Sequence, residues 1–163
     1  MEIPQGYRLA GLLVAMPDLP EGPSQARAYS VESVSDGDTF SVGYGGETFW
    51  IRLAGIDAPE KGQPYGEISR TILSGLIGEG EVQLVPLGSD KYKRTVAYVF
   101  NREGIEVSAR MVHSGAAWWY RDYAENRKDL EALQADARSA RRGLWVEKAP
   151  IPPWQWRGSQ RKK

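Results

Sequence analysis

Alternating apolar and polar positions from Tyr29 onward predict a series of short β-strands. We expect strands over residues 29–35, 39–44, 47–53, 81–87 and 95–100. The pair Gly45-Gly46 separates the second and third of these segments, and a glycine pair in that place is typical of a two-residue hairpin turn. The first half of the chain is therefore dominated by strands, at least one pair of which forms a hairpin.

Apolar positions with helical spacing predict three helices. They cover residues 65–77, 105–113 and 125–142, and a glycine follows each of them within two residues. Five short strands with a helix between the third and fourth are typical of a small closed or partly closed barrel, of which the OB-fold is the commonest. We predict an α+β fold, a five-stranded OB-fold-type β-barrel with three α-helices.

The same patterns divide the chain into three parts. We expect an N-terminal extension (1–28), a barrel domain (29–146) and a basic tail rich in Pro and Trp (147–163). The extension has two interpretations, a degenerate secretory signal or a disordered lead-in, because its apolar run is short and is followed by a long polar spacer. We expect the end of the tail, from Arg157 onward, to be solvated and to assist polyanion binding. No apolar run approaches the ~18 residues of a membrane-spanning helix.

Composition narrows the possible chemistry. The 163 residues include no Cys and one His. Disulfides, thiolate zinc sites, a Cys nucleophile and paired-His metal sites are thereby excluded, and a His-centred triad is disfavoured. The formal net charge is zero, but acidic residues dominate residues 1–89 and basic residues dominate 90–163. Charge alone leaves two interpretations open, a solvated basic half or an acidic metal-binding edge folded against a basic phosphate-binding one.

Three polar clusters carry the candidate chemistry. They are Asp36-Gly37-Asp38-Thr39, the segment from Arg52 to Glu60, and the segment from Ser89 to Arg94. Carboxylates two residues apart on an extended backbone point the same way, and a carboxylate of the second cluster could join them in an oxygen site for a hard divalent ion. The third cluster could grip phosphate. Taken singly, each cluster also fits a plain turn, a strand-end ion pair or a solvated hairpin.

Together and in this order, the clusters resemble the staphylococcal nuclease (thermonuclease) family. The shared motifs are D-G-D-T, then R-L-x-G-I-D-A-P-E, then D-x-Y-x-R, then a helix followed by G-x-A. The resemblance covers roughly residues 29–145, and its second motif is specific. It implies a Ca²⁺-dependent endonuclease that hydrolyses phosphodiester bonds in DNA and RNA with little sequence preference and leaves 3′-phosphate ends.

The resemblance also implies a role for each matching residue. Asp38, Asp57 and the carbonyl of Ala58 would bind Ca²⁺, and Asp36 would support them without touching the ion. Arg52 and Arg94 would hold the scissile phosphate, and Glu60 would act on the attacking water. Lys91 and Tyr92 would contact a neighbouring phosphate, and Tyr123 would face a nucleotide. Phosphoryl transfer needs chiefly positioning and charge neutralisation, which these residue types supply.

Two departures from the family pattern affect the expected site. Lys93 stands where a glycine usually precedes the second arginine, which bears on how the loop delivers Arg94, and Arg121 replaces an aromatic residue of the best-known member. The alternative function is an inactive OB-fold module that binds nucleic acid or protein. We expect DNA and RNA as partners, no membrane and a monomer. For localisation, the family favours a secreted or periplasmic protein, and a cytoplasmic one stays open.

Overall fold

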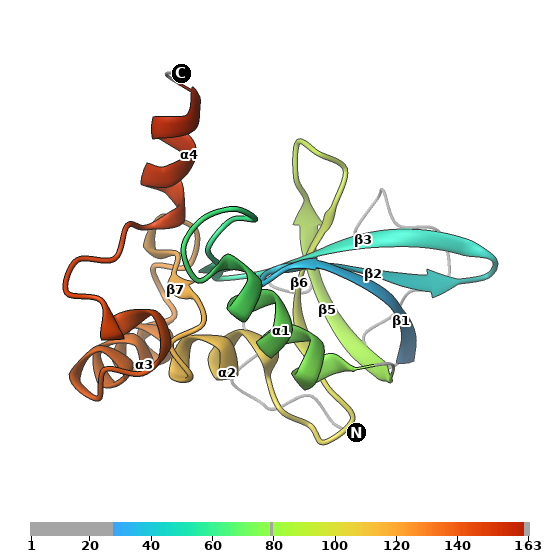
Figure 1. Cartoon of the computed structure of the whole chain (residues 1–163). Helices are drawn as coiled ribbons and strands as arrows, with labels where there is room; N and C mark the ends of the chain where they lie inside the picture. The colour runs from blue at the N-terminus through green and yellow to red at the C-terminus, as the bar shows by residue number, and fades with distance from the viewer. Residues whose placement is uncertain (1–27, 79, 162–163) are drawn as a thin grey trace.

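A closed five-stranded barrel forms the body of the computed structural model, which describes residues 28–78 and 80–161 (Figure 1). Its strands are β1 (Ala28–Asp36), β2 (Thr39–Tyr44), β3 (Glu47–Leu53), β5 (Glu81–Ser89) and β6 (Thr95–Phe100). They follow the order β1-β2-β3-β6-β5, and β1 pairs with β5 to close the barrel. Only β3 and β6 pair in parallel among these strands. The predicted α+β fold with a five-stranded barrel is confirmed, whereas the expected extension lies almost wholly outside the described residues.

The β2–β3 hairpin fixes the register on which the polar clusters depend. Gly45 and Gly46 have φ of 59° and 81°, values that favour glycine and form a turn matching the twist of the two strands. The pairing that results sets Thr39 opposite Arg52. The first two polar clusters therefore meet at the end of the hairpin away from its turn.

The described residues contain four α-helices, one more than the sequence predicted. They are α1 (Gly66–Ile77), α2 (Val107–His113), α3 (Lys128–Ser139) and α4 (Pro153–Arg161), with single 3₁₀ turns at Arg121–Tyr123 (η2) and Gly143–Val146 (η3). The additional helix is α4, which begins with a proline at its first position, where proline's missing N–H is of no consequence. None of the helices described is long and apolar enough to cross a membrane.

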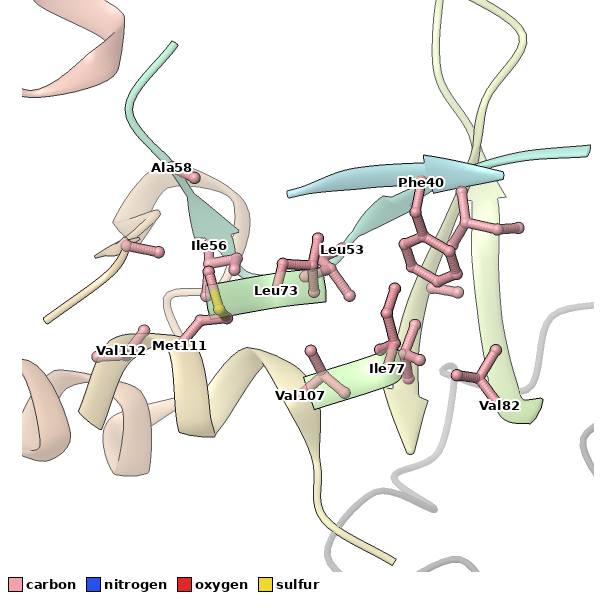
Figure 2. Packing of buried hydrophobic residues seen from close by; sticks show 14 of the residues in the cluster. Phe40, Leu53, Ile56, Ala58, Leu73, Ile77, Val82, Val107, Met111 and Val112 are labelled. Carbon is pink, nitrogen blue, oxygen red and sulfur yellow. The ribbon is translucent and has the colours of Figure 1, made fainter. Parts of the chain in front are cut away.

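The main core lies between the barrel and helices α1 and α2 (Figure 2). Phe40 and Leu53 from the barrel, Leu73 from α1, and Val107 and Met111 from α2 are each at most 1% exposed. Burying a side chain of this size contributes about 1.5–3 kcal/mol. This packing fixes the ends of β2 and β3, and so fixes the polar residues that follow them.

A smaller aromatic cluster ties the C-terminal part of the chain to the body. Two-residue strands β4 (Ile56–Asp57) and β7 (Trp118–Trp119) pair with each other beside the barrel. The ring of Trp118 packs edge-on against two other rings. Its centroid lies 4.5 Å from that of Trp145 and 5.6 Å from that of Trp154 in α4. Helix α4 therefore begins at a defined place next to β7 and the loop that follows β4 (Figure 1).

Candidate active site

Arg52 joins the first two polar clusters. Its Nη2 lies 3.4 Å from Oδ2 of Asp38 and 3.3 Å from Oδ1 of Asp57. Its Nη1 donates to the carbonyl oxygens of Leu53 at 2.6 Å and Ile56 at 2.9 Å. Both terminal nitrogens of a largely buried guanidinium thus have partners, which offsets the cost of removing it from water. The carboxylates of Asp38 and Asp57 therefore converge on one nitrogen of Arg52.

Asp38 is held as an ionised carboxylate inside the protein. Its Oδ2 accepts a hydrogen bond from the N–H of Ala58 at 2.8 Å, and its Oδ1 accepts one from Oγ1 of Thr39 at 3.0 Å. Burial acts to raise the pKa of Asp38, but the Arg52 charge and these hydrogen bonds hold it below its usual value. Asp38 therefore offers a permanent negative charge 5% exposed to solvent.

Asp36 lies next to Asp38, and its pKa is shifted in the opposite direction. The N–H of Asp38 donates to Oδ1 of Asp36 at 3.0 Å. Burial, followed by the neighbouring negative charge of Asp38, raises the pKa of Asp36 to about 8. Gly37 between them has no room for a side chain, because a Cβ there would lie 2.0 Å from Oγ of Ser69 on α1. The D-G-D-T segment is consequently pressed against the helix that covers it.

Arg94 reaches the same site from the loop between β5 and β6. Asp90 organises this loop, since its Oδ1 accepts hydrogen bonds from the backbone N–H groups of Tyr92 at 2.9 Å and Arg94 at 3.0 Å. Its Oδ2 accepts from Nε of Arg94 at 2.8 Å, and Nη1 of Arg94 reaches Oγ1 of Thr39 at 3.3 Å. Lys93 adopts a left-handed φ of 63°, the conformation that a glycine would supply more easily. With lysine at this position, the loop still brings Arg94 to Thr39.

Asp57 and Glu60 meet a partner that the sequence did not predict, Arg157 of α4. Its Nη2 donates to Oδ2 of Asp57 at 2.8 Å, and its Nη1 donates to Oδ1 of Asp57 at 3.1 Å and to Oε1 of Glu60 at 2.6 Å. Burial raises the pKa of Asp57 to about 6 against the opposing effect of these hydrogen bonds. The bond to Asp57 in turn raises the pKa of Arg157. The expectation that Arg157 belongs to a solvated end is wrong.

The remaining predicted residues lie around this centre rather than within it. Tyr92 and Tyr123 are 65% and 77% exposed, and both Lys91 and Arg94 lie over the Tyr92 ring at 5.1 Å from its centroid. Tyr123 packs against Tyr120 at 4.6 Å between ring centroids, and the hydroxyl of Tyr120 lies 3.5 Å from Nη2 of Arg157. Exposed tyrosine rings thus lie next to Arg94 and, through Tyr120, close to Arg157.

The donor set of the site is made of oxygen atoms only. Within residues 28–78 and 80–161, no group of three or more His, Cys, Asp or Glu side chains is arranged to hold a metal ion. Asp38 and Asp57 nevertheless lie within 3.4 Å of one Arg52 nitrogen, so one cation could be shared between them. Two carboxylates are suited to a hard divalent ion, whose remaining ligands would be water and substrate oxygens.

Comparison with known proteins places this site in a family. The family model described as "Staphylococcal nuclease homologue" matches residues 50–147, which include Arg52, Glu60 and Arg94. An "Uncharacterized endonuclease" of Escherichia coli is 40% identical over 127 residues, covering 78% of this chain and 82% of that protein. One of the same name from Haemophilus influenzae is 36% identical and covers 94% and 85%. A "Micrococcal nuclease" of Shigella flexneri is 35% identical and covers 78% of each. The chain belongs to the staphylococcal nuclease family.

Proposed function

We propose that this protein is a calcium-dependent nuclease that hydrolyses phosphodiester bonds in DNA and RNA with little sequence preference, leaving 3′-phosphate ends. The observation that carries the proposal is the convergence of Arg52 and Arg94 on a site with two buried carboxylates, Asp38 and Asp57. Family membership and relatives named as endonucleases support the hydrolytic activity. We further propose that residues 29–146 form the nuclease domain and that the protein acts as a monomer.

The fit of the site to a divalent cation rests on its donor chemistry. Asp38 and Asp57 supply hard oxygen ligands, and the buried Ala58 lies directly after Asp57, where its carbonyl could serve as a third. A bound Ca²⁺ would supply positive charge to a phosphate oxygen and lower the cost of forming a nucleophile from water. Asp36 would support Asp38 from behind without contacting the ion.

The arginines provide the second part of the mechanism. Charge accumulates on the phosphate oxygens during phosphoryl transfer, and a planar guanidinium can bind two such oxygens at once. Arg52 is held on β3 opposite Thr39, and Arg94 is held by the Asp90 loop with its Nη1 at Oγ1 of Thr39. They are thereby positioned before substrate arrives, so binding requires little further ordering.

Glu60 is the residue we propose to act on the attacking water. Its N–H donates to Oε1 of Gln63 at 2.9 Å, which fixes the backbone of the loop that presents it. A carboxylate next to the phosphate site can orient a water molecule and accept its proton. Lys91, Tyr92 and Tyr123 would bind the flanking nucleotides through charge and stacking, each stacked ring contributing ~1–3 kcal/mol.

Cleavage of single-stranded DNA with Ca²⁺ and with EGTA tests the proposal. Arg52→Lys, Arg94→Lys and Glu60→Gln should each lose about 10²-fold or more in rate while circular dichroism shows a folded protein. Arg110→Lys, on the exposed side of α2, is the matched control and should cut at the wild-type rate. Asp38→Ala should weaken the response to Ca²⁺. Activity surviving all three site variants would refute the assignment, and tight DNA binding without cutting would favour the inactive OB-fold module.

A further inference from the structure

Helix α4 is anchored to the body of the protein before it reaches the active site. The side-chain amide of Gln63 donates to the carbonyl oxygen of Ile151 at 2.7 Å, just ahead of the helix. At its first turn, the Trp154 ring stacks on Tyr120 with centroids 5.5 Å apart and planes 4° from parallel. Pro153 is buried beside it. These contacts hold the start of α4 in place, so the position of a residue one turn later is defined.

That residue, Arg157, contacts three carboxylate oxygens of the site. It bonds both oxygens of Asp57 and Oε1 of Glu60, at distances between 2.6 and 3.1 Å. The Asp57 side chain is 1% exposed, whereas that of Arg157 is 34% exposed. The carboxylate is therefore fixed inside the protein, while the guanidinium approaches from the solvent side and can leave in that direction.

We propose that Arg157 is an internal counter-ion that occupies the carboxylates in the resting protein and must be displaced by the divalent cation, which makes α4 an autoinhibitory latch. The inference rests on the proposed function, since it concerns the same carboxylates. A guanidinium bonded to both oxygens of Asp57 and a divalent cation bound by Asp57 compete for the same lone pairs. Their positive charges also repel each other.

The contact with Glu60 extends the latch to the proton-accepting group. Oε1 of Glu60, which accepts a hydrogen bond from Nη1 of Arg157 at 2.6 Å, is occupied by the guanidinium rather than by a water molecule. While Arg157 stays in place, both the metal-binding carboxylate and the proposed base are engaged. Displacing one side chain would release both groups together, so the Ca²⁺ concentration needed for activity would be higher than the free carboxylates alone would require.

Calcium binding measured by isothermal titration calorimetry tests the latch without reference to activity. The full-length protein, Arg157→Gln and the control Arg161→Gln are titrated with CaCl₂ in the same buffer. Arg161 lies one turn further along α4, is exposed, and bonds the carbonyl of Arg157 through its Nε at 3.4 Å. Arg157→Gln should bind Ca²⁺ about tenfold more tightly or better, a change of ~1.4 kcal/mol. Arg161→Gln, which removes the same charge, should stay within about twofold of wild type.

A second variant keeps the test decisive if Arg157→Gln does not fold. Trp154→Ala removes the ring that stacks on Tyr120. The start of α4, and with it Arg157, is then held less firmly, while no carboxylate is changed. The variant should also tighten Ca²⁺ binding, by a smaller factor than Arg157→Gln. Unchanged affinity in both variants would overturn the latch. Weaker binding in Arg157→Gln would overturn it as well and would make Arg157 a positioning residue.

Cleavage of single-stranded DNA by the same samples separates the two proposals. If affinities shift as expected and no sample cuts DNA or RNA, the nuclease proposal fails and the latch stands. If all samples cut and bind Ca²⁺ with equal affinity, the latch fails and the nuclease stands. If neither wild type nor Arg157→Gln binds Ca²⁺, both are overturned. With both correct, the Ca²⁺ concentration giving half-maximal cutting should fall in Arg157→Gln by the factor measured calorimetrically.

Discussion

Replacing Asp36 with Asn tests whether the Asp36 side chain is protonated in the folded protein near neutral pH. Burial and the adjacent Asp38 raise the pKa of Asp36 to about 8, so near neutrality this side chain is mostly a neutral acid. Asn has the same shape, can accept the hydrogen bond from the Asp38 N–H, and can donate to the Asp38 carboxylate. The variant therefore imitates protonated Asp36 at every pH.

The size of the effect follows from proton linkage. The folded protein holds this proton to about pH 8, whereas an ordinary Asp releases it near 3.8. Because the folded state binds the proton more tightly, the stability it provides is complete below pH 3.8, falls as pH rises, and levels off above about pH 8. Each pH unit in that window corresponds to ~1.4 kcal/mol. Between about pH 5 and pH 7, wild type should lose up to ~3 kcal/mol relative to Asp36→Asn.

Urea unfolding in EGTA at about pH 5, 6 and 7 measures this difference directly. Asp129→Asn is the matched control, because its hydrogen bond from Arg127 lowers the pKa of Asp129. Stability from a lowered carboxyl is lost only as pH falls below about 4, so its difference from wild type should stay constant from pH 5 to 7. A constant difference for Asp36→Asn as well would mean that Asp36 is ionised in the folded protein, and the reasoning would be refuted.

Two backbone substitutions test the local conformations that shape the site and its surroundings. Lys93→Gly should stabilise the protein by up to ~1 kcal/mol in urea unfolding, because the left-handed φ of 63° is strained for lysine, and destabilisation would contradict that account. Gly115→Ala should lower the free energy of unfolding by ~2 kcal/mol or more, since its φ is +72° and its Cβ would lie 2.1 Å from the carbonyl oxygen of Arg142. Gly75→Ala, inside α1 with nothing within 4 Å of its Cβ, is the control and should stabilise by ~0.5–1 kcal/mol in the same measurement.

The parts of the fold that sequence reasoning predicted are those with local signals. The bounds of β2 and β3 match the predicted segments because a glycine pair fixes their hairpin and apolar alternation runs through both strands. Strands β4 and β7 were missed, since two residues are too few to show a period and their pairing joins segments far apart in the chain. Helix α3 is shorter than predicted, Lys128–Ser139 against residues 125–142. The apolar residues keep helical spacing beyond Ser139, but the backbone leaves the helix there and Arg141 has a left-handed φ of 54°.

The candidate site likewise combines residues that local sequence motifs predicted with one, Arg157, that they did not. Local motifs contained Asp38, Arg52 and Asp57. The register of one hairpin sets Arg52 opposite Thr39, next to Asp38, and the hydrogen bond from the Ala58 N–H to Asp38 holds the segment that carries Asp57. Arg157 lies 100 residues from Asp57 in the chain, and no spacing rule connects the two. The available signal was weak. It consisted of a Pro-Trp segment followed directly by an arginine. Because exposed tryptophan rings tend to pack on another apolar surface, that packing would also have placed the arginine against the protein.

The three arginines of the site differ in what holds them, and this difference separates positioning from inhibition. Arg52 is held by carbonyl oxygens close to it in the chain in addition to the carboxylates, and Arg94 is held by Asp90 of its own loop, so both have partners that remain when the carboxylates bind a cation. Arg157 has its shortest contacts with the carboxylates themselves and is delivered by an aromatic stack outside the barrel. Filling the carboxylates with a cation would leave the first two arginines in position to meet phosphate and would release the third. Two carboxylates from the acidic first half of the chain, Asp57 and Glu60, are thus paired with an arginine of the basic second half, which a bound cation would replace.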